Sequence, residues 1–135
     1  MIVSWLSFIC FIVAALVHIG FFVFEFFFLP KPEVYRSLGY TDDTIKSVKV
    51  WARNVGIYNL ALALGVFSGL HFIFKKEIMT AGAVTGLCGF TMIAAGVTLW
   101  VTAPNLRKWA LWQALPPLIG FFFLMLHVLE RVGVL

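Results

Sequence analysis

The sequence predicts an all-α, polytopic integral membrane protein: a four-transmembrane-helix bundle with one short amphipathic helix in the first loop. Of its 135 residues, 62% are hydrophobic and only 12% are charged, and the mean hydropathy is +1.01. A soluble domain carries about 25% charged residues. Four apolar runs each reach the length of about 20 residues that crosses a hydrocarbon core. Together they use nearly the whole chain, so a single domain over 1–135 is expected.

The four expected spans are separated by charged and turn-forming residues. The first run is far longer than the about 7–15 apolar residues of a signal peptide, so we expect it to be retained as a span. It ends at Pro30-Lys31-Pro32, and a polar loop follows over 30–50. In that loop, Thr41-Asp42-Asp43 is typical of a helix N-terminus and predicts an amphipathic helix leading into span two. The expected spans are about 2–29, 51–74, 78–101 and 109–129.

The distribution of Lys and Arg predicts an orientation, because cytoplasmic loops carry an excess of both. Seven lie near the first and third loops: Lys31, Arg36, Lys46, Lys49, Arg53, Arg107 and Lys108. Three lie at the opposite face: Lys75, Lys76 and Arg131. We therefore expect the first and third loops to be cytoplasmic and both termini to lie outside. Four of the five Trp residues fall at the first-and-third-loop end, as an aromatic belt would require.

Several function classes are disfavoured by composition. The net charge of +4 is not arranged as a basic stripe interleaved with aromatics, so no nucleic-acid partner is expected. Cys10 and Cys88 lie in apolar runs without a C-x-x-C motif, which argues against thiol-redox chemistry and a disulfide scaffold. His18, His71 and His127 are scattered in depth, so neither a metal site nor any cofactor is expected. The lipid bilayer is the expected partner.

Polar side chains inside the spans are the candidates for chemistry, because a charge at a helix centre costs about 2.5–3.5 kcal/mol on insertion scales. Span one places His18 and Glu25 seven residues apart, on one helical face but about 10 Å apart along the axis. At about 1.5 Å per residue from the Trp-rich end, Glu25 lies roughly 6 Å deep and His18 roughly 16 Å deep. Their partners must therefore come from other helices.

The other spans contribute polar residues at similar depth, predicting one polar layer. Its expected members are Asn54, Tyr58, Asn59, Thr98 and Gln113. Gly120 reaches the depth of His18, and its missing side chain would leave space beneath this layer. The functional interpretation is a pocket that opens at the first loop, with Glu25 at its mouth and His18 at its base. The structural alternative is that these groups form interhelical hydrogen bonds of about 0.6 kcal/mol each, with Glu25 reaching the interface.

Small residues on span three predict close helix packing. Gly82 and Gly86 form a G-x-x-x-G pattern, which permits close approach of two helix backbones. The pattern is compatible with packing inside the bundle and with a homo-oligomer formed through the Gly82/Gly86 face.

The segment Asn54-Val55-Gly56-Ile57-Tyr58-Asn59, followed by Leu60-Ala61-Leu62-Ala63-Leu64-Gly65, resembles the N-x-G-x-Y-N…L-A-x-G signature of a family. These are small four-span bacterial membrane proteins, known as the domain of unknown function family 1304. His18 with Glu25 is similar to the family's first-span pair, and Gln113 with Pro116 to its Q-x-x-P element. The resemblance covers nearly the whole chain. It implies the architecture, the candidate positions and a bacterial inner (cytoplasmic) membrane location, but no activity.

Three functions follow from this sequence. The first is binding or transport of a small hydrophobic or cationic molecule, with Glu25 exchanging a proton as the molecule binds. The second is a membrane-embedded enzyme acting on a lipid or isoprenoid, with Glu25 and His18 as an acid–base pair. The third is a structural or accessory subunit in which the polar residues only set helix packing.

Overall fold

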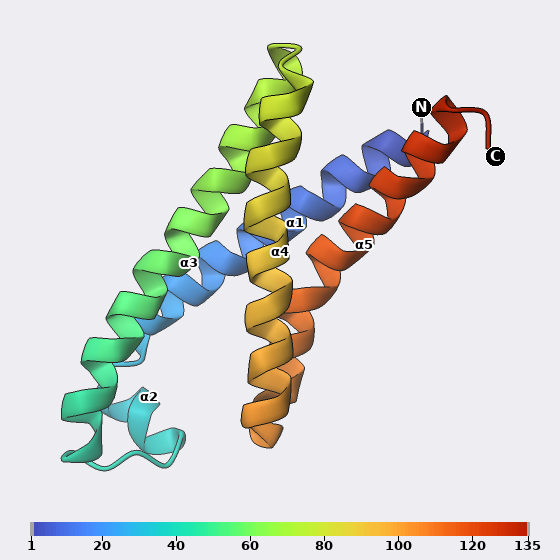
Figure 1. Ribbon diagram of the computed structural model, residues 1–135. Coiled ribbons are helices and arrows are strands. Elements are labelled where there is room, and N and C mark those ends of the chain that lie inside the picture. The colour runs from blue at the N-terminus through green and yellow to red at the C-terminus, as the bar shows by residue number, and fades with distance from the viewer. Residues whose placement is uncertain (1, 135) are drawn as a thin grey trace.

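The computed structural model describes residues 2–134, and its regular structure is entirely helical, which confirms the predicted fold class. Four helical segments are long and apolar enough to cross a membrane: Ser4–Phe28, Thr44–Phe74, Ile78–Thr102 and Pro104–Arg131. The elements in chain order are α1 (Ile2–Val23), η1 (Phe24–Phe28), α2 (Pro32–Ser37), α3 (Thr44–Phe74), α4 (Ile78–Thr102), η2 (Pro104–Leu106) and α5 (Arg107–Arg131) (Figure 1).

The first connection confirms one sequence expectation and adds a helix that the sequence does not predict. The amphipathic segment and span two form one continuous helix, α3, which begins at Thr44. Thr41 and Thr44 stabilise its start reciprocally, because each hydroxyl accepts a hydrogen bond from the other residue's backbone N–H, at 3.2 and 2.9 Å. The unexpected element is helix α2, which starts at Pro32. Proline suits the first turn of a helix because its missing N–H would have no partner there.

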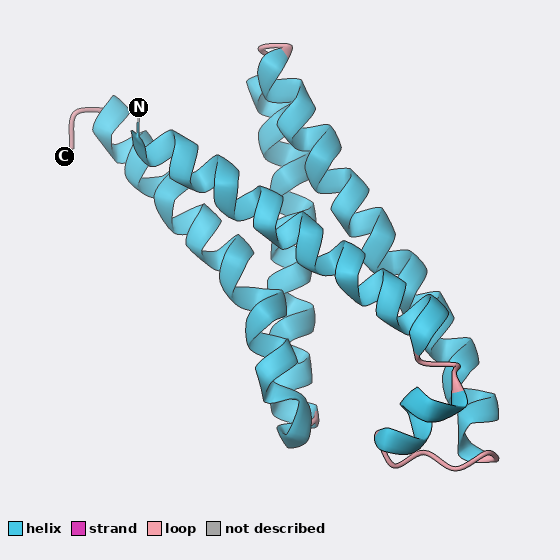
Figure 2. Cartoon of the chain, turned by 180° about the vertical axis from the view of Figure 1, so that it is seen from behind, coloured by secondary structure: helices cyan, strands magenta, loops and turns pink. Residues whose placement is uncertain are grey.

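The four long helices form a splayed bundle in which each packs against two neighbours. α1 lies against α3 and α5, and α4 completes the ring between them. The helices cross near their middles and diverge toward both ends (Figures 1 and 2). Both termini and the α3–α4 turn lie at one end, and α2 and the α4–α5 connection lie at the other. This alternation of ends is what an even number of spans requires.

The core sits where the helices cross. Its buried members are Phe11, Ala14, Ala15, Ala63, Val66, Leu70 and Met92. Glycines let the backbones approach there: a Cβ at Gly69 would lie 2.1 Å from Thr85 Oγ1, and one at Gly89 would lie 2.9 Å from the Phe121 ring. By contrast, a Cβ at Gly82 or Gly86 would meet nothing within 4 Å. The Gly82/Gly86 stripe therefore faces outward and is not used in packing between the described helices.

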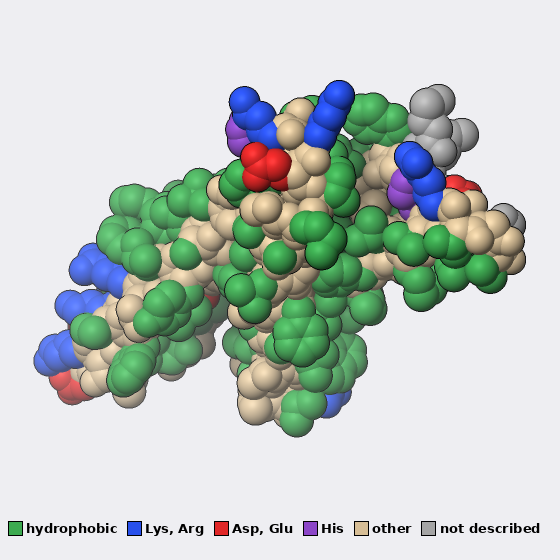
Figure 3. Space-filling model, turned by 45° about the horizontal axis from the view of Figure 1, so that its top comes forward, with side chains coloured by type: hydrophobic (Ala, Val, Ile, Leu, Met, Phe, Trp, Pro, Cys, Tyr) green, Lys and Arg blue, Asp and Glu red, His purple; other side chains and the backbone are tan. Residues whose placement is uncertain are grey.

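The bundle end that carries α2 divides into two parts, which we call the first arm (η1, α2 and the start of α3) and the second arm (the end of α4, η2 and the start of α5). In the first arm, Leu29 and Tyr35 pack against Ile45 in a small apolar cluster. In the second arm, Gly96 packs so closely that a Cβ there would lie 2.8 Å from Ala114 Cβ. A notch separates the two arms (Figure 3).

Candidate functional site

Glu25 is seated against α3 by two residues of the span-two motif. Asn59 Nδ2 donates a 2.8 Å hydrogen bond to Glu25 Oε2. One turn earlier, a Cβ at Gly56 would lie 3.5 Å from Glu25 Cβ and 3.7 Å from Oε2. Asn59 is only 5% exposed and lies in line with the buried Ala63 and Val66, so this stripe of α3 faces the bundle interior. The motif thus supplies a flat surface and one donor for a carboxylate inside a span.

Glu25 lies in a π-helical turn that the sequence did not predict. In η1 the Leu29 N–H donates to the carbonyl of Phe24, five residues earlier, at 2.8 Å. Such turns are rare, and they occur frequently at functional sites. Since the turn holds an extra residue, the side chains from Phe24 onward depart from the spacing of a regular α-helix, and the seven-residue alignment of Glu25 with His18 is only approximate.

The Glu25 carboxylate has no cationic partner among the described residues. The ion pairs among the described residues join Arg36 with Asp42, Lys46 with Asp43 and His127 with Glu130. A carboxylate can accept about four hydrogen bonds, whereas Glu25 accepts one from a described residue, at Oε2. Its Oε1 accepts no hydrogen bond from a described residue. This oxygen is not fully buried, so it retains accessible surface. The Glu25 carboxylate is therefore half-buried and can accept further hydrogen bonds.

His18 is fully buried, and one of its ring nitrogens has no hydrogen-bond partner among the described residues. Its Nδ1 lies 2.9 Å from the Ala14 carbonyl oxygen. Because a carbonyl can only accept, Nδ1 carries the proton and Nε2 of the neutral ring holds a lone pair. Nε2 is buried and forms no hydrogen bond with a described residue. The ring meets the edge of Phe21 at 5.8 Å, and Phe21 meets Trp109 of α5 at 6.3 Å, which links α1 to the second arm beside His18.

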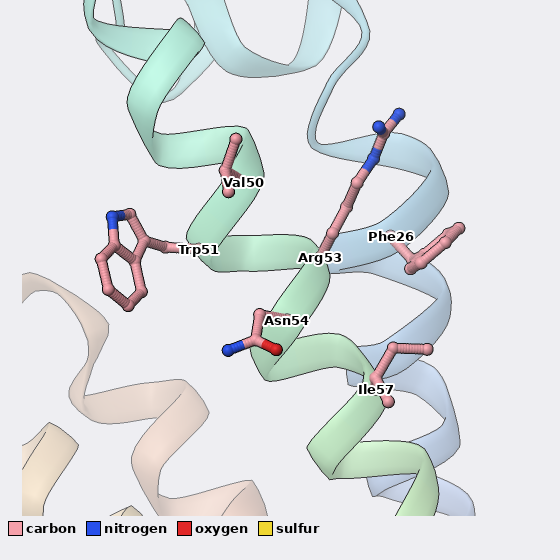
Figure 4. A pocket seen from close by; sticks show the side chains of 6 residues that line it. All are labelled: Phe26, Val50, Trp51, Arg53, Asn54 and Ile57. Carbon is pink, nitrogen blue, oxygen red and sulfur yellow. The ribbon is translucent and has the colours of Figure 1, made fainter.

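Asn54 and Tyr58 do not join Glu25 on the inner face of α3. Both are exposed, Tyr58 at 59%, whereas the adjacent Asn59 is buried. Asn54 instead lines a surface groove of about 380 Å³ (Figure 4). The groove is lined by Phe26, Val50, Trp51, Arg53, Asn54 and Ile57.

The remaining members of the expected layer have local roles. Thr98 is exposed, and its hydroxyl donates to the Ala94 carbonyl of its own helix at 2.8 Å. Gln113 is half-buried and forms no hydrogen bond with a described residue. The space expected at Gly120 is occupied, because a Cβ there would lie 3.1 Å from the Phe11 ring. The Gly120 carbonyl accepts a 2.8 Å hydrogen bond from Ser7, a buried contact that sequence reasoning missed.

A cluster of polar side chains stabilises the first loop, which lies outside the spans. Asp42 accepts hydrogen bonds from Tyr35 Oη at 2.6 Å and from Arg36 Nη2 at 2.9 Å. The bonds from Tyr35 and Arg36 lower the pKa of Asp42 below its usual value of 3.8. The same bond to Asp42 raises the pKa of Tyr35. The cluster holds α2 over the first arm.

The architecture and the contacts of Glu25 define a class: a small four-span membrane protein with a hydrogen-bonded carboxylate inside its first span. The chain belongs to the family described as protein of unknown function (DUF1304), whose model matches residues 12–125. The match includes His18, Glu25, Gly56, Asn59 and Gln113, and it confirms the resemblance seen in the sequence. No curated protein and no solved structure shows detectable similarity to the chain. Among residues 2–134, no three His, Cys, Asp or Glu side chains cluster as metal ligands would.

Proposed function

We propose that this protein binds a small hydrophobic or cationic molecule inside the membrane, and that Glu25 is the group that contacts it. The observation that carries the proposal is an intramembrane carboxylate with one hydrogen bond, an accessible Oε1 and no cationic partner among the described residues. An unpaired charge in a span is costly, and such residues mark ligand or proton pathways. A bound cation, or a proton in its absence, would neutralise Glu25.

The space between the two arms is the proposed binding region. Glu25 bonds to Asn59, whose side of α3 faces the bundle interior. Phe21 and Trp109 would offer aromatic faces, which attract organic cations by about 0.5–2 kcal/mol each. His18 would lie deepest, and its buried Nε2 could accept a hydrogen bond from the ligand only after neighbouring side chains move. We propose that this end of the bundle is cytoplasmic, in a bacterial inner membrane, as the seven Lys and Arg residues indicate.

Binding is better supported than transport. The notch lies at the α2 end of the molecule (Figure 3). At the opposite end, the Phe8 ring of α1 meets the Phe74 ring of α3 at 5.9 Å, so α1 and α3 remain in contact there. A transporter would require a second arrangement that opens that end.

The test uses tetraphenylphosphonium, a lipophilic organic cation, as the probe for the purified full-length protein in detergent. Binding would be followed by calorimetry and by quenching of Trp fluorescence. Glu25→Gln should weaken binding at least about tenfold, since an interaction with a charged group contributes about 1.5–3 kcal/mol. Glu33→Gln, which removes a carboxylate from α2, is the matched control and should bind as the parent does. Triphenylphosphine oxide, a neutral aromatic probe, should bind equally to all three proteins. Equal tetraphenylphosphonium binding by the parent and Glu25→Gln would refute the proposal.

One observation favours a second candidate, an enzyme acting on a membrane lipid or isoprenoid. The His18 lone pair at Nε2 is a general base without a competing partner. Glu25 and His18 have no described contact with each other, and seven residues of helix separate them by about 10 Å. They would therefore act on two separate positions of one extended substrate. If Glu25→Gln and His18→Ala both preserve probe binding and cell phenotype, the structural role stands instead.

A further inference from the structure

The groove on the outer face of the first arm combines an apolar floor with uncompensated positive charge. Its volume of about 380 Å³ falls in the range of about 300–1,000 Å³ that is usual for ligand sites. Val50, Trp51 and Ile57 of α3 line it and are exposed, Trp51 at 70%. Trp51 is also the kind of residue that anchors a helix at the headgroup level. The groove thus begins at the membrane interface and continues toward the apolar region.

Arg53 lies at the groove without an anionic partner among the described residues. Its guanidinium lies 5.6 Å from the centre of the Phe26 ring, which orients it by a cation–π contact. Lys49 precedes it by four residues and therefore lies on the same side of α3. The ion pairs of the described residues involve Arg36, Lys46 and His127. Lys49 and Arg53 form none, so no described carboxylate neutralises their charges.

The close-up shows how these side chains are distributed (Figure 4). Arg53 extends on the same side of α3 as Phe26 and Ile57, and Asn54 and Trp51 point to the other side. Ile57 lies one turn deeper in the membrane than Arg53, because α3 runs from the first loop into the bilayer. Charge at the outer end and apolar side chains at the inner end match the order of groups in a phospholipid.

We propose that this groove binds an anionic glycerophospholipid of the bilayer. The guanidinium of Arg53 donates hydrogen bonds to the lipid phosphate, and the Lys49 ammonium adds charge at the headgroup. One acyl chain lies along Phe26 and Ile57. This site is on the outer surface of the bundle and is separate from the Glu25 site between the arms.

The experiment is native mass spectrometry of the full-length, delipidated protein in detergent. Phosphatidylglycerol and phosphatidylcholine with identical acyl chains would be added in separate titrations. The parent should bind phosphatidylglycerol at least about fivefold more tightly, because one Lys or Arg near the surface contributes about 1 kcal/mol with anionic lipid. Arg53→Gln should remove most of this preference, and Arg53→Lys should retain part of it, since lysine keeps the charge but loses the planar donors.

Two controls separate a built site from general attraction to basic loops. Lys108→Gln removes one positive charge from the same end of the bundle but outside the groove, and it should keep the full preference. Phe26→Ala keeps every charge but removes the ring beneath the guanidinium, and it should lower phosphatidylglycerol binding. If Lys108→Gln and Arg53→Gln lose the preference equally, the attraction is diffuse and the proposed site is wrong.

The same spectra test two other occupants. Glycerol 3-phosphate at the lipid's concentration should not displace phosphatidylglycerol, because it lacks the acyl chains; displacement would show a site for free phosphate instead. A dimer whose abundance falls in Arg53→Gln, without any change in lipid adducts, would show that a second copy covers the groove and would overturn the proposal.

Discussion

Asn59 of α3 donates a hydrogen bond of 2.8 Å from Nδ2 to Oε2 of Glu25 in η1, which joins the first two spans inside the membrane. The two residues are 34 positions apart in the chain. Because the donor is buried and the acceptor only half-buried, the bond fixes one carboxylate oxygen and leaves the other accessible. It therefore joins η1 to α3 and leaves Oε1 of Glu25 able to accept further hydrogen bonds.

The coupling between Glu25 and Asn59 is measurable by a double-mutant cycle. Glu25→Gln, Asn59→Leu and the double variant should show a coupling free energy of about 0.6–1.7 kcal/mol, the range found for hydrogen bonds between membrane helices. Unfolding would be followed by steric trapping in bicelles. A coupling near zero, with both single variants folded, would mean that the two side chains act independently.

Gly96→Ala should destabilise the second arm. The new Cβ would lie 2.8 Å from Ala114 Cβ and 2.9 Å from the Ala110 carbonyl oxygen, so α4 and α5 must move apart. We expect a loss of about 1–3 kcal/mol, as for other overpacked sites. Gly20→Ala is the matched control because its Cβ would meet nothing within 4 Å, and helix propensity should leave its stability unchanged or up to about 1 kcal/mol higher. Thermal melts in detergent would compare the two, and equal melting temperatures would contradict the packing at Gly96.

His18→Leu should separate stability from function. The substitution removes a buried nitrogen that has no partner, so the free energy of unfolding should change by less than about 1 kcal/mol despite the loss of the bond to Ala14. Phe11→Ala, a large-to-small change in the same helix, should cost about 3–5 kcal/mol. If His18 serves a ligand, His18→Leu keeps its melting temperature but loses probe binding. A large fall in melting temperature would instead show that the imidazole is structural.

The first loop should loosen in acid. The pKa of Asp42 is lower in the folded protein than its ordinary value of 3.8, because Tyr35 and Arg36 bond its charged form. The stabilisation is therefore fully present above about pH 4 and is lost as the pH falls through the lowered folded value. Protein labelled with 3-fluorotyrosine would report the change as a shift of the Tyr35 ¹⁹F signal. Arg36→Gln should move the transition to higher pH, and Asp42→Asn should abolish it; a transition that persists in Asp42→Asn would assign it to another group.

Self-association through the Gly82/Gly86 face remains a prediction. A Cβ at either position meets no described atom within 4 Å, and the neighbouring Leu87 and Phe90 are 70% and 67% exposed. If two copies pack there, Gly86→Cys should form a disulfide-linked dimer in membranes under mild oxidation, and Gly82→Leu should prevent it. Gly20→Cys, on a different helix, is the control. Cross-linking by both cysteines to the same extent would indicate random collision.

Some of the site could be read directly from residue types. Glu25 and Asn59 stand out because polar groups are costly in lipid, and a glycine one turn before Asn59 predicts a close neighbour. The π-helical turn at η1 was not predictable, because Phe24-Glu25-Phe26-Phe27-Phe28 differs in no local signal from a regular apolar helix. The sequence does not predict helix α2, because Pro30-Lys31-Pro32 indicates the end of the first span. Proline also occurs in the first turn of a helix, as Pro32 does here.

By itself, the sequence determined that this is a four-span membrane protein and which polar groups lie within its spans. Run length, charge depletion and the Pro and Lys boundaries suffice for this, because each span satisfies its own backbone hydrogen bonds. Only the tertiary structure decided which face of each helix packs inside the bundle and which faces outward. Core and lipid are both apolar, so hydrophobic periodicity cannot distinguish them. The packing of η1 against Gly56 and Asn59 is what directs Asn59 to Glu25, while Asn54 and Tyr58 on the same helix lie exposed.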